Sequence, residues 1–174
     1  MAVSLHVHVT RLWLVHTAAP ADLVRRTVFL AWRLAQERDE ITTLAVAGFG
    51  VVDTLQAGGA LELSRSRLNS ITVPPTTADT AGLVCNLEIQ HAYAAVLDGR
   101  PDEAVAPLDT AAEIAGRFGA TAEADALGFV HAPADVALHR MSLALDMGDP
   151  DQVVHIAANT APESHPFWVG QAQI

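Results

Sequence analysis

The sequence predicts an all-α protein built from consecutive helical hairpins. The first observation is a repeated turn pattern, in which a glycine and a proline separate two stretches of helical character. The second is the composition: 51% of the residues are apolar but only 5% are aromatic, so Ala, Val and Leu must form the core. A chain of 174 residues is long enough for one domain of about four such hairpins.

The turn pattern is clearest in two segments, Leu97–Val105 and Asp146–Val154. Each contains a glycine that can end a helix in the left-handed conformation, a single spacer residue, and a proline that begins the next helix. Acidic residues follow each proline, where the positive end of a helix favours them. Weaker copies occur at Ala19–Val24 and Gly58–Leu63. The four copies are 39, 42 and 49 residues apart, which is looser than a strict repeat of about 34 residues.

These turns divide the chain into eight predicted helices. They span approximately residues 4–17, 20–37, 40–57, 59–70, 77–98, 101–118, 133–147 and 150–160. Pro107 falls inside the sixth helix and should bend its axis without breaking it, because proline removes one backbone hydrogen bond. The alternation of Leu5–Val9 leaves a strand as the alternative to the first helix. Residues Pro166–Ile174 have the pattern of a further helix that would cover the last apolar face.

Charge and hydropathy exclude several classes of function. The net charge is −10, and the ten basic residues, all Arg, are scattered, so the basic stripe that binds phosphates is missing. No apolar run approaches the roughly 18 residues of a membrane span, and the N-terminus lacks the basic start of a secretory signal. We therefore expect a cytoplasmic protein that contacts neither nucleic acid nor membrane. The single cysteine, Cys85, lies in an apolar stretch and is predicted to be an inert, buried thiol.

The run Pro133–Pro150, followed by the segment Phe167–Trp168, resembles the C-terminal repeat region of actinobacterial helix-turn-helix regulators of the XRE type. The resemblance extends from about Leu12 to Ile174 and is strongest after Asn86. It implies a tetratricopeptide-like α-α superhelix over residues 1–174, acting as the sensor region of a regulator.

Two departures from that family are visible. The family usually has Pro-Thr-Asn-Val where this chain has Pro133-Ala134-Asp135-Val136, so a carboxylate replaces an amide and a different ligand preference becomes possible. The DNA-binding domain would need about 60 residues ahead of the repeats, and the chain begins too close to the first repeat to include it. The resemblance therefore implies an ancestry in transcriptional regulation, without DNA binding by this chain alone.

Polar residues at i, i+4 and i+7 form one stripe on each of three first-of-pair helices. Aligning the two clearest hairpins through Gly99 and Gly148 places two of these stripes opposite each other. The stripe residues are Ser4, His8 and Arg11 in the first helix, and Asn86, Gln90 and Tyr93 opposite Asp135, His139 and Ser142, respectively, in the two hairpins. Because first-of-pair helices line the concave face of such a superhelix, we expect a ligand-binding groove. The alternative is an ordinary solvated face.

The sequence indicates neither catalysis nor a metal or cofactor site. Asp135 and His139 at i, i+4 could form an ion pair or supply two metal ligands, but no cluster offers the third and fourth. The glycines of Gly48-Phe49-Gly50 lie in a helical pattern, so they are interpreted as small residues for close helix packing and not as a phosphate loop. Trp13, Trp32 and Trp168 are interpreted as packing anchors.

These observations predict a non-catalytic protein that binds a peptide, small ligand or protein in its groove. The alternative is a structural protein–protein adaptor that forms a homodimer or docks through its exposed helix edges.

Overall fold

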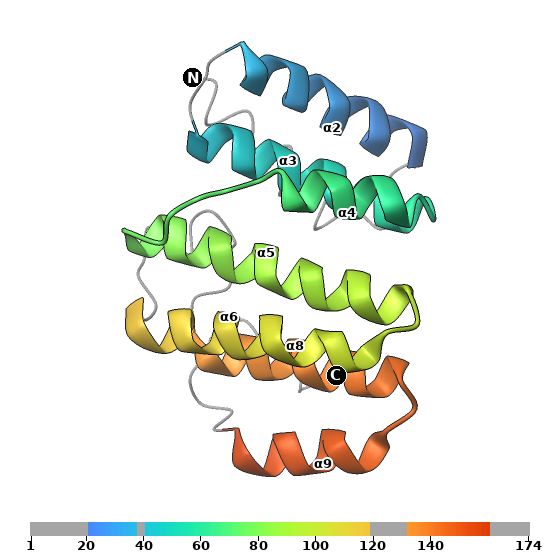
Figure 1. Cartoon of the computed structure of the whole chain (residues 1–174), viewed down its shortest axis with the longest axis vertical. Coiled ribbons are helices and arrows are strands. Elements are labelled where there is room, and N and C mark those ends of the chain that lie inside the picture. The colour runs from blue at the N-terminus through green and yellow to red at the C-terminus, as the bar shows by residue number, and fades with distance from the viewer. Residues whose placement is uncertain (1–20, 38–40, 119–131, 161–174) are drawn as a thin grey trace. The chain divides into compact units, whose positions relative to one another are not determined.

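The computed structural model describes residues 21–37, 41–118 and 132–160, and all regular structure within these ranges is helical. The chain divides into two compact units, Met1–Pro74 (unit 1) and Pro75–Ile174 (unit 2). In unit 1 the helices are α2 (Ala21–Gln36), α3 (Ile41–Ala57) and α4 (Leu61–Asn69). In unit 2 they are α5 (Ala78–Leu97), the 3-10 helix η1 (Pro101–Ala104), α6 (Val105–Phe118), α8 (Pro133–Asp146) and α9 (Pro150–Asn159) (Figure 1).

The all-α prediction is confirmed for the described residues, and most helix ends lie within two residues of their predicted positions. The first predicted helix at residues 4–17, the alternative strand at Leu5–Val9 and the last segment, Pro166–Ile174, lie outside the described residues. The tetratricopeptide-like superhelix and the single domain over residues 1–174 stay predictions.

Three glycines end helices with the same turn. Gly59, Gly99 and Gly148 have φ angles of 74°, 73° and 74°, in the left-handed region that glycine adopts without steric cost. In each turn the glycine amide donates to the carbonyl three residues before it, and the next amide donates to the carbonyl five residues before it, all at 2.9 Å. This pair of bonds is the Schellman motif, which satisfies carbonyls that would otherwise lack a partner. The predicted turns at Gly99 and Gly148, and the weaker copy at Gly59, are therefore confirmed.

Pro107 was predicted to lie inside one helix over residues 101–118 and to bend its axis without breaking it, and the structure places it just after a change of helix type. The segment begins as the 3-10 helix η1, with Pro101 at its start, and changes to the α-helix α6 at Val105. Pro107 is thus the third residue of α6, and because η1 runs into α6 without interruption, the bend predicted there stays a prediction.

Unit 1 is built around the apolar helix α3, in which residues 45–52 are all buried. A Cβ atom added to Gly48 would lie 2.7 Å from Cδ1 of Ile71 and 3.2 Å from Cζ3 of Trp32. The interpretation of this glycine as a site of close packing is therefore confirmed. Trp32 also packs under the guanidinium of Arg67, whose Cζ lies 4.5 Å from the ring centroid, so it anchors α2 against the segment at the end of α4.

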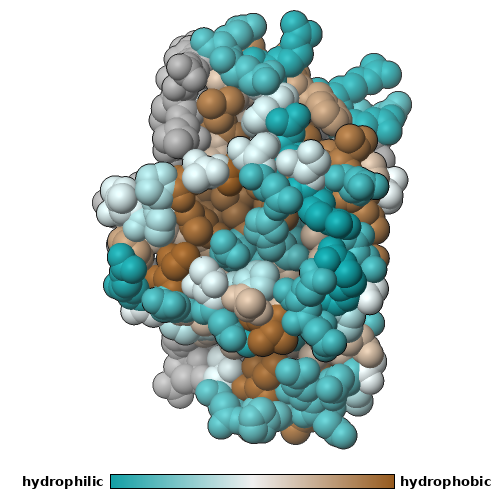
Figure 2. Space-filling model, in the orientation of Figure 1, coloured by the Kyte–Doolittle hydropathy of each residue, from teal (hydrophilic) through white to brown (hydrophobic). Residues whose placement is uncertain are grey.

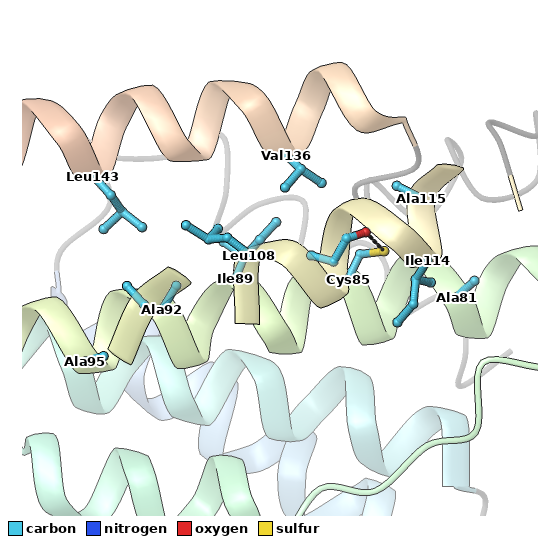
Figure 3. Packing of buried hydrophobic residues seen from close by; sticks show 12 residues of the cluster. Ala81, Cys85, Ile89, Ala92, Ala95, Leu108, Ile114, Ala115, Val136 and Leu143 are labelled. Carbon is cyan, nitrogen blue, oxygen red and sulfur yellow. Dashed lines mark hydrogen bonds between the residues drawn. The ribbon is translucent and has the colours of Figure 1, made fainter. Parts of the chain in front are cut away.

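Unit 2 has one apolar core that α5, α6 and α8 share (Figure 3). Ile89 of α5, Leu108 of α6, and Val136 and Leu143 of α8 meet in it, each at most 6% exposed. The hairpin α8–α9 adds its first helix to this core, while α9 contains no buried residue. The core fixes α5 and α8 as neighbours, which positions the polar residues that both helices carry.

Within the described residues, no helix combines the length and apolar character needed to cross a membrane.

Candidate functional site

The side chains of Tyr93 on α5 and His139 on α8 meet between the two helices. The phenol oxygen of Tyr93 lies 3.3 Å from Nδ1 of His139. The ring centroids are 5.9 Å apart and the ring planes are at 89°, which is the edge-to-face arrangement that aromatic rings favour. Both side chains are partly buried. This pair joins two residues 46 positions apart in the chain and is the centre of the candidate site.

Ser142 and Asp146 of α8 extend the cluster around the Tyr93 phenol. Burial raises the pKa of Tyr93, the Ser142 side chain lowers it by hydrogen bonding, and the negative charge of Asp146 raises it. In the 3.3 Å contact between the Tyr93 hydroxyl and Nδ1 of His139 either atom can donate, and a neutral imidazole that accepts at Nδ1 carries its proton on Nε2.

His139 is held in its neutral form by its surroundings. Burial lowers the pKa of His139 below its usual value of 6.5, and the nearby Asp135 carboxylate opposes this shift. Because the pKa of Tyr93 is raised, the phenol stays protonated as well. Near pH 7 the centre of the site is therefore a pair of uncharged rings that can both donate and accept hydrogen bonds, with a carboxylate on either side.

The remaining predicted stripe residues on these helices are less exposed than a solvated face would be. Gln90 is 8% exposed and Asp135 is 7% exposed. Asp135 also has a local structural role, since its Oδ2 accepts from the backbone amide of Ala132 at 3.1 Å and so caps the start of α8. The Nδ2 of Asn86 donates to the carbonyl of Gly82 in its own helix at 2.9 Å.

The structure brings together three of the nine predicted site residues, Tyr93, His139 and Ser142. The alignment placed Tyr93 opposite Ser142. Tyr93 lies near Ser142 and also contacts His139, one helical turn earlier on α8. Ser4, His8 and Arg11 lie outside the described residues.

Asp146 was missed as a site residue, although it lies four positions after Ser142 and continues the spacing of Asp135, His139 and Ser142. Its position beside the Gly148 turn pointed to a turn residue instead. The spacing alone was the signal that could have identified it.

Other chemistry in the described residues is limited. No three His, Cys, Asp or Glu side chains among them are close enough together to hold a metal ion. Cys85 is buried as predicted, and its thiol donates to the carbonyl of Ala111 at 3.4 Å. Burial, followed by the charge of Glu88, raises the pKa of Cys85 to about 12. The thiol therefore stays protonated at neutral pH and is a poor nucleophile.

Comparison of the chain with protein-family models, with curated proteins and with solved structures finds no significant match. What the structure shows is an all-helical chain, in its described residues, with partly buried Tyr93 of α5 in contact with partly buried His139 of α8.

Proposed function

We propose that the chain is a non-catalytic binding protein whose polar stripe on α5 and α8 receives a peptide or small ligand. The stripe consists of Asn86, Gln90 and Tyr93 on α5 and Asp135, His139, Ser142 and Asp146 on α8. The observation that carries the proposal is the Tyr93–His139 pair, which places two partly buried, uncharged, hydrogen-bonding rings side by side. Such amphipathic groups among apolar helices are typical of sites that orient a ligand.

The hairpins and their Schellman turns support a tetratricopeptide-like superhelix, in which α5 and α8 would be first-of-pair helices lining the concave face. With the resemblance of Pro133–Pro150 to XRE-type regulators, this arrangement supports a cytoplasmic, sensor-like role.

A binding screen tests the proposal. The whole chain is used to select ligands from a phage-displayed library of random heptapeptides and from a library of small polar metabolites. Each hit is then measured by titration calorimetry against His139→Asn and against His155→Asn, a matched change at an exposed histidine of α9. Loss of one buried hydrogen bond should weaken binding by about tenfold in His139→Asn, and His155→Asn should bind normally. The proposal fails if no ligand is found or if both variants bind as the wild type does.

The alternative, a protein–protein adaptor, is favoured by one specific observation on α2. Leu23 and Leu30 are 59% and 56% exposed, and Leu34 continues the same helix face. Figure 2 shows hydrophobic side chains, in brown, between the hydrophilic residues of the visible surface. If the α2 face that carries Leu23, Leu30 and Leu34 mediates self-association, sedimentation velocity should show a dimer at high micromolar concentration. Leu30→Glu should abolish that dimer. A chain that stays monomeric would remove this alternative.

A further inference from the structure

The hairpin α8–α9 is the most lightly packed part of unit 2 in the described residues. Four residues of α8 are buried, and α9 contains no buried residue. The helix α5, in contrast, has buried residues on every side between residues 81 and 95. Because elements that bury little apolar surface open at a lower free energy than the rest of a domain, this hairpin is the part that can detach while α5 and α6 stay folded.

His139 lies in the contact by which α8 is attached to α5. It follows Val136 by three positions and precedes Leu143 by four, so it lies on nearly the same side of α8 as these two core residues (Figure 3). Its Nδ1 is 3.3 Å from the phenol oxygen of Tyr93, and the two rings meet edge to face. The contact itself therefore shields the imidazole from water, and detachment of α8 exposes it.

The groups that face His139 from α8 and α5 do not offset the cost of charging it. On α8 the Asp135 carboxylate favours the protonated imidazole, but burial outweighs this effect and lowers the pKa of His139. On α5 the facing group is the uncharged phenol of Tyr93. The other titratable side chains in the middle of α5, Glu88 and His91, lie on the far side of that helix.

The helices α6 and α9 bring no further compensating charge to the imidazole. Their titratable side chains are exposed: Asp109, Glu113 and Arg117 on α6, and Asp151 and His155 on α9. Asp109 is paired with Arg140, the residue after His139, with Oδ1 and Nη2 2.6 Å apart. A proton on His139 is therefore costly as long as α8 stays attached.

We propose that His139 makes the docking of the α8–α9 hairpin sensitive to pH, so that protonation of its imidazole favours detachment of α8 and α9 while α5 and α6 stay folded. A neutral imidazole can accept from Tyr93 at Nδ1, whereas an imidazolium can only donate and carries a charge that water solvates better than this contact does. The hairpin detaches as one piece, because α9 packs mainly against α8. This inference does not depend on the proposed binding function.

Hydrogen exchange of the backbone amides, followed by mass spectrometry of the whole chain at pH 7.5 and 5.5, tests the inference. After correction for intrinsic exchange rates, the amides of α8 and α9 should lose protection by up to about tenfold at pH 5.5, the limit for one histidine about one pH unit below its ordinary pKa. The amides of α5 and α6 should stay more protected than those of α8 and α9 at both pH values. Equal protection throughout unit 2 would show that it opens as a whole and would overturn the inference.

Two histidine substitutions separate detachment of the hairpin from global unfolding. His91 lies two residues before Tyr93, about 200° around α5, and burial lowers its pKa as well. Detachment of α8 and α9 exposes His139 and leaves His91 in place, whereas global unfolding exposes both. His139→Asn should therefore reduce the pH effect on the α8 and α9 amides to less than about twofold, and His91→Asn should leave it unchanged. A reduction by both variants, or by neither, would contradict local detachment.

Two further measurements keep the test decisive. His155→Asn, at an exposed position of α9, should leave the pH effect on the α8 and α9 amides unchanged, and its loss there would assign the effect to the wrong histidine. Circular dichroism at pH 7.5 checks that each variant is folded. Should His139→Asn fail to fold, His91→Asn decides alone, because a smaller pH effect on the α8 and α9 amides in that variant would show global opening.

Discussion

Unit 1 and unit 2 use the same hairpin geometry for different purposes. Both end a helix with a Schellman glycine, and both pack apolar helix faces against each other. In unit 1 the central helix α3 is buried along residues 45–52 and approaches its neighbours through Gly48, so its described interior is almost wholly apolar. In unit 2 the polar side chains of Tyr93 and His139 meet between α5 and α8, beside the apolar core that these helices share. Under the proposed function, this difference would assign the ligand site to unit 2.

The largest expected effect comes from the core that holds α8 in place. Leu143→Ala should destabilise unit 2 by about 2–5 kcal/mol, because it opens a cavity where the side chain is 1% exposed. Leu145→Ala is the matched control, since that leucine is 60% exposed on the same helix, and it should change stability by less than about 0.5 kcal/mol. Urea unfolding followed by far-ultraviolet circular dichroism measures both. Similar effects would mean that α8 is not held by this core.

The packing glycine of unit 1 provides the next test. Gly48→Ala places a Cβ 2.7 Å from Ile71 and 3.2 Å from Trp32, and such overpacking should cost about 1–3 kcal/mol. Gly50→Ala is two residues away, where the nearest atom is 3.5 Å from the added Cβ. It should stabilise the helix by up to about 1 kcal/mol through its higher helix propensity. Urea unfolding of the two variants should therefore move in opposite directions, and a stabilised Gly48→Ala would remove the close-packing account.

A smaller effect is expected at the turn that positions Asp146. Gly148→Ala forces an L-residue to φ 74° and should cost about 1 kcal/mol. Gly116→Ala, at an exposed helical position of α6 with no atom within 4 Å of the added Cβ, should stabilise by a similar amount. Thermal unfolding of the two variants gives the comparison. If both alanines stabilise, the left-handed turn is not required.

The pH dependence of folding stability should also distinguish the units, because every histidine in the described residues lies in unit 2. Burial lowers the pKa of His139 in the folded chain below its ordinary value of 6.5. At a pH between the folded pKa and 6.5, the unfolded chain therefore binds a proton at this residue that the folded chain does not. Stability therefore decreases as pH falls through 6.5 and levels off below the folded pKa.

His91, whose pKa is also lowered by burial, contributes in the same direction. Replacing His139 with Asn should reduce the slope of stability against pH between about 7.5 and 5.5, relative to His155→Asn. Denaturant midpoints measured across that range provide the slopes. An unchanged slope would show that the imidazole does not titrate differently in the folded chain.

The limits of sequence-based prediction follow from which interactions are local. Helix ends and turns were predictable because a glycine and a proline a few residues apart determine them, as at Gly99 and Pro101. The contact between Tyr93 and His139 was not predictable, because it depends on how the ridges of α5 and α8 interlock across the core that contains Ile89, Leu108 and Leu143. The alignment placed Tyr93 opposite Ser142, which lies near it, but did not pair Tyr93 with His139.

The sequence around Asp135 and Pro107 also did not indicate their local structural context. Asp135 was expected to face a ligand, and its carboxylate also accepts a hydrogen bond from the backbone amide of Ala132 at the start of α8. Pro107 was expected in a helix interior because the change from 3-10 to α-helix at Val105 leaves no mark in the hydrophobic pattern.

In the last comparison no effect is expected: the chain alone should not bind DNA with sequence selectivity. Specific readout requires an element that enters a groove and a basic surface that neutralises phosphates. Unit 2 is strongly acidic, and in unit 1 the adjacent pair Arg25 and Arg26 both contact Asp22. Salt at about 0.15 M screens repulsion beyond roughly 8 Å, but screening creates no contact. An electrophoretic shift assay with fragments of its own upstream region should therefore show no band at micromolar protein. A salt-sensitive, sequence-selective complex would assign recognition to unit 1 and reverse the comparison between the units.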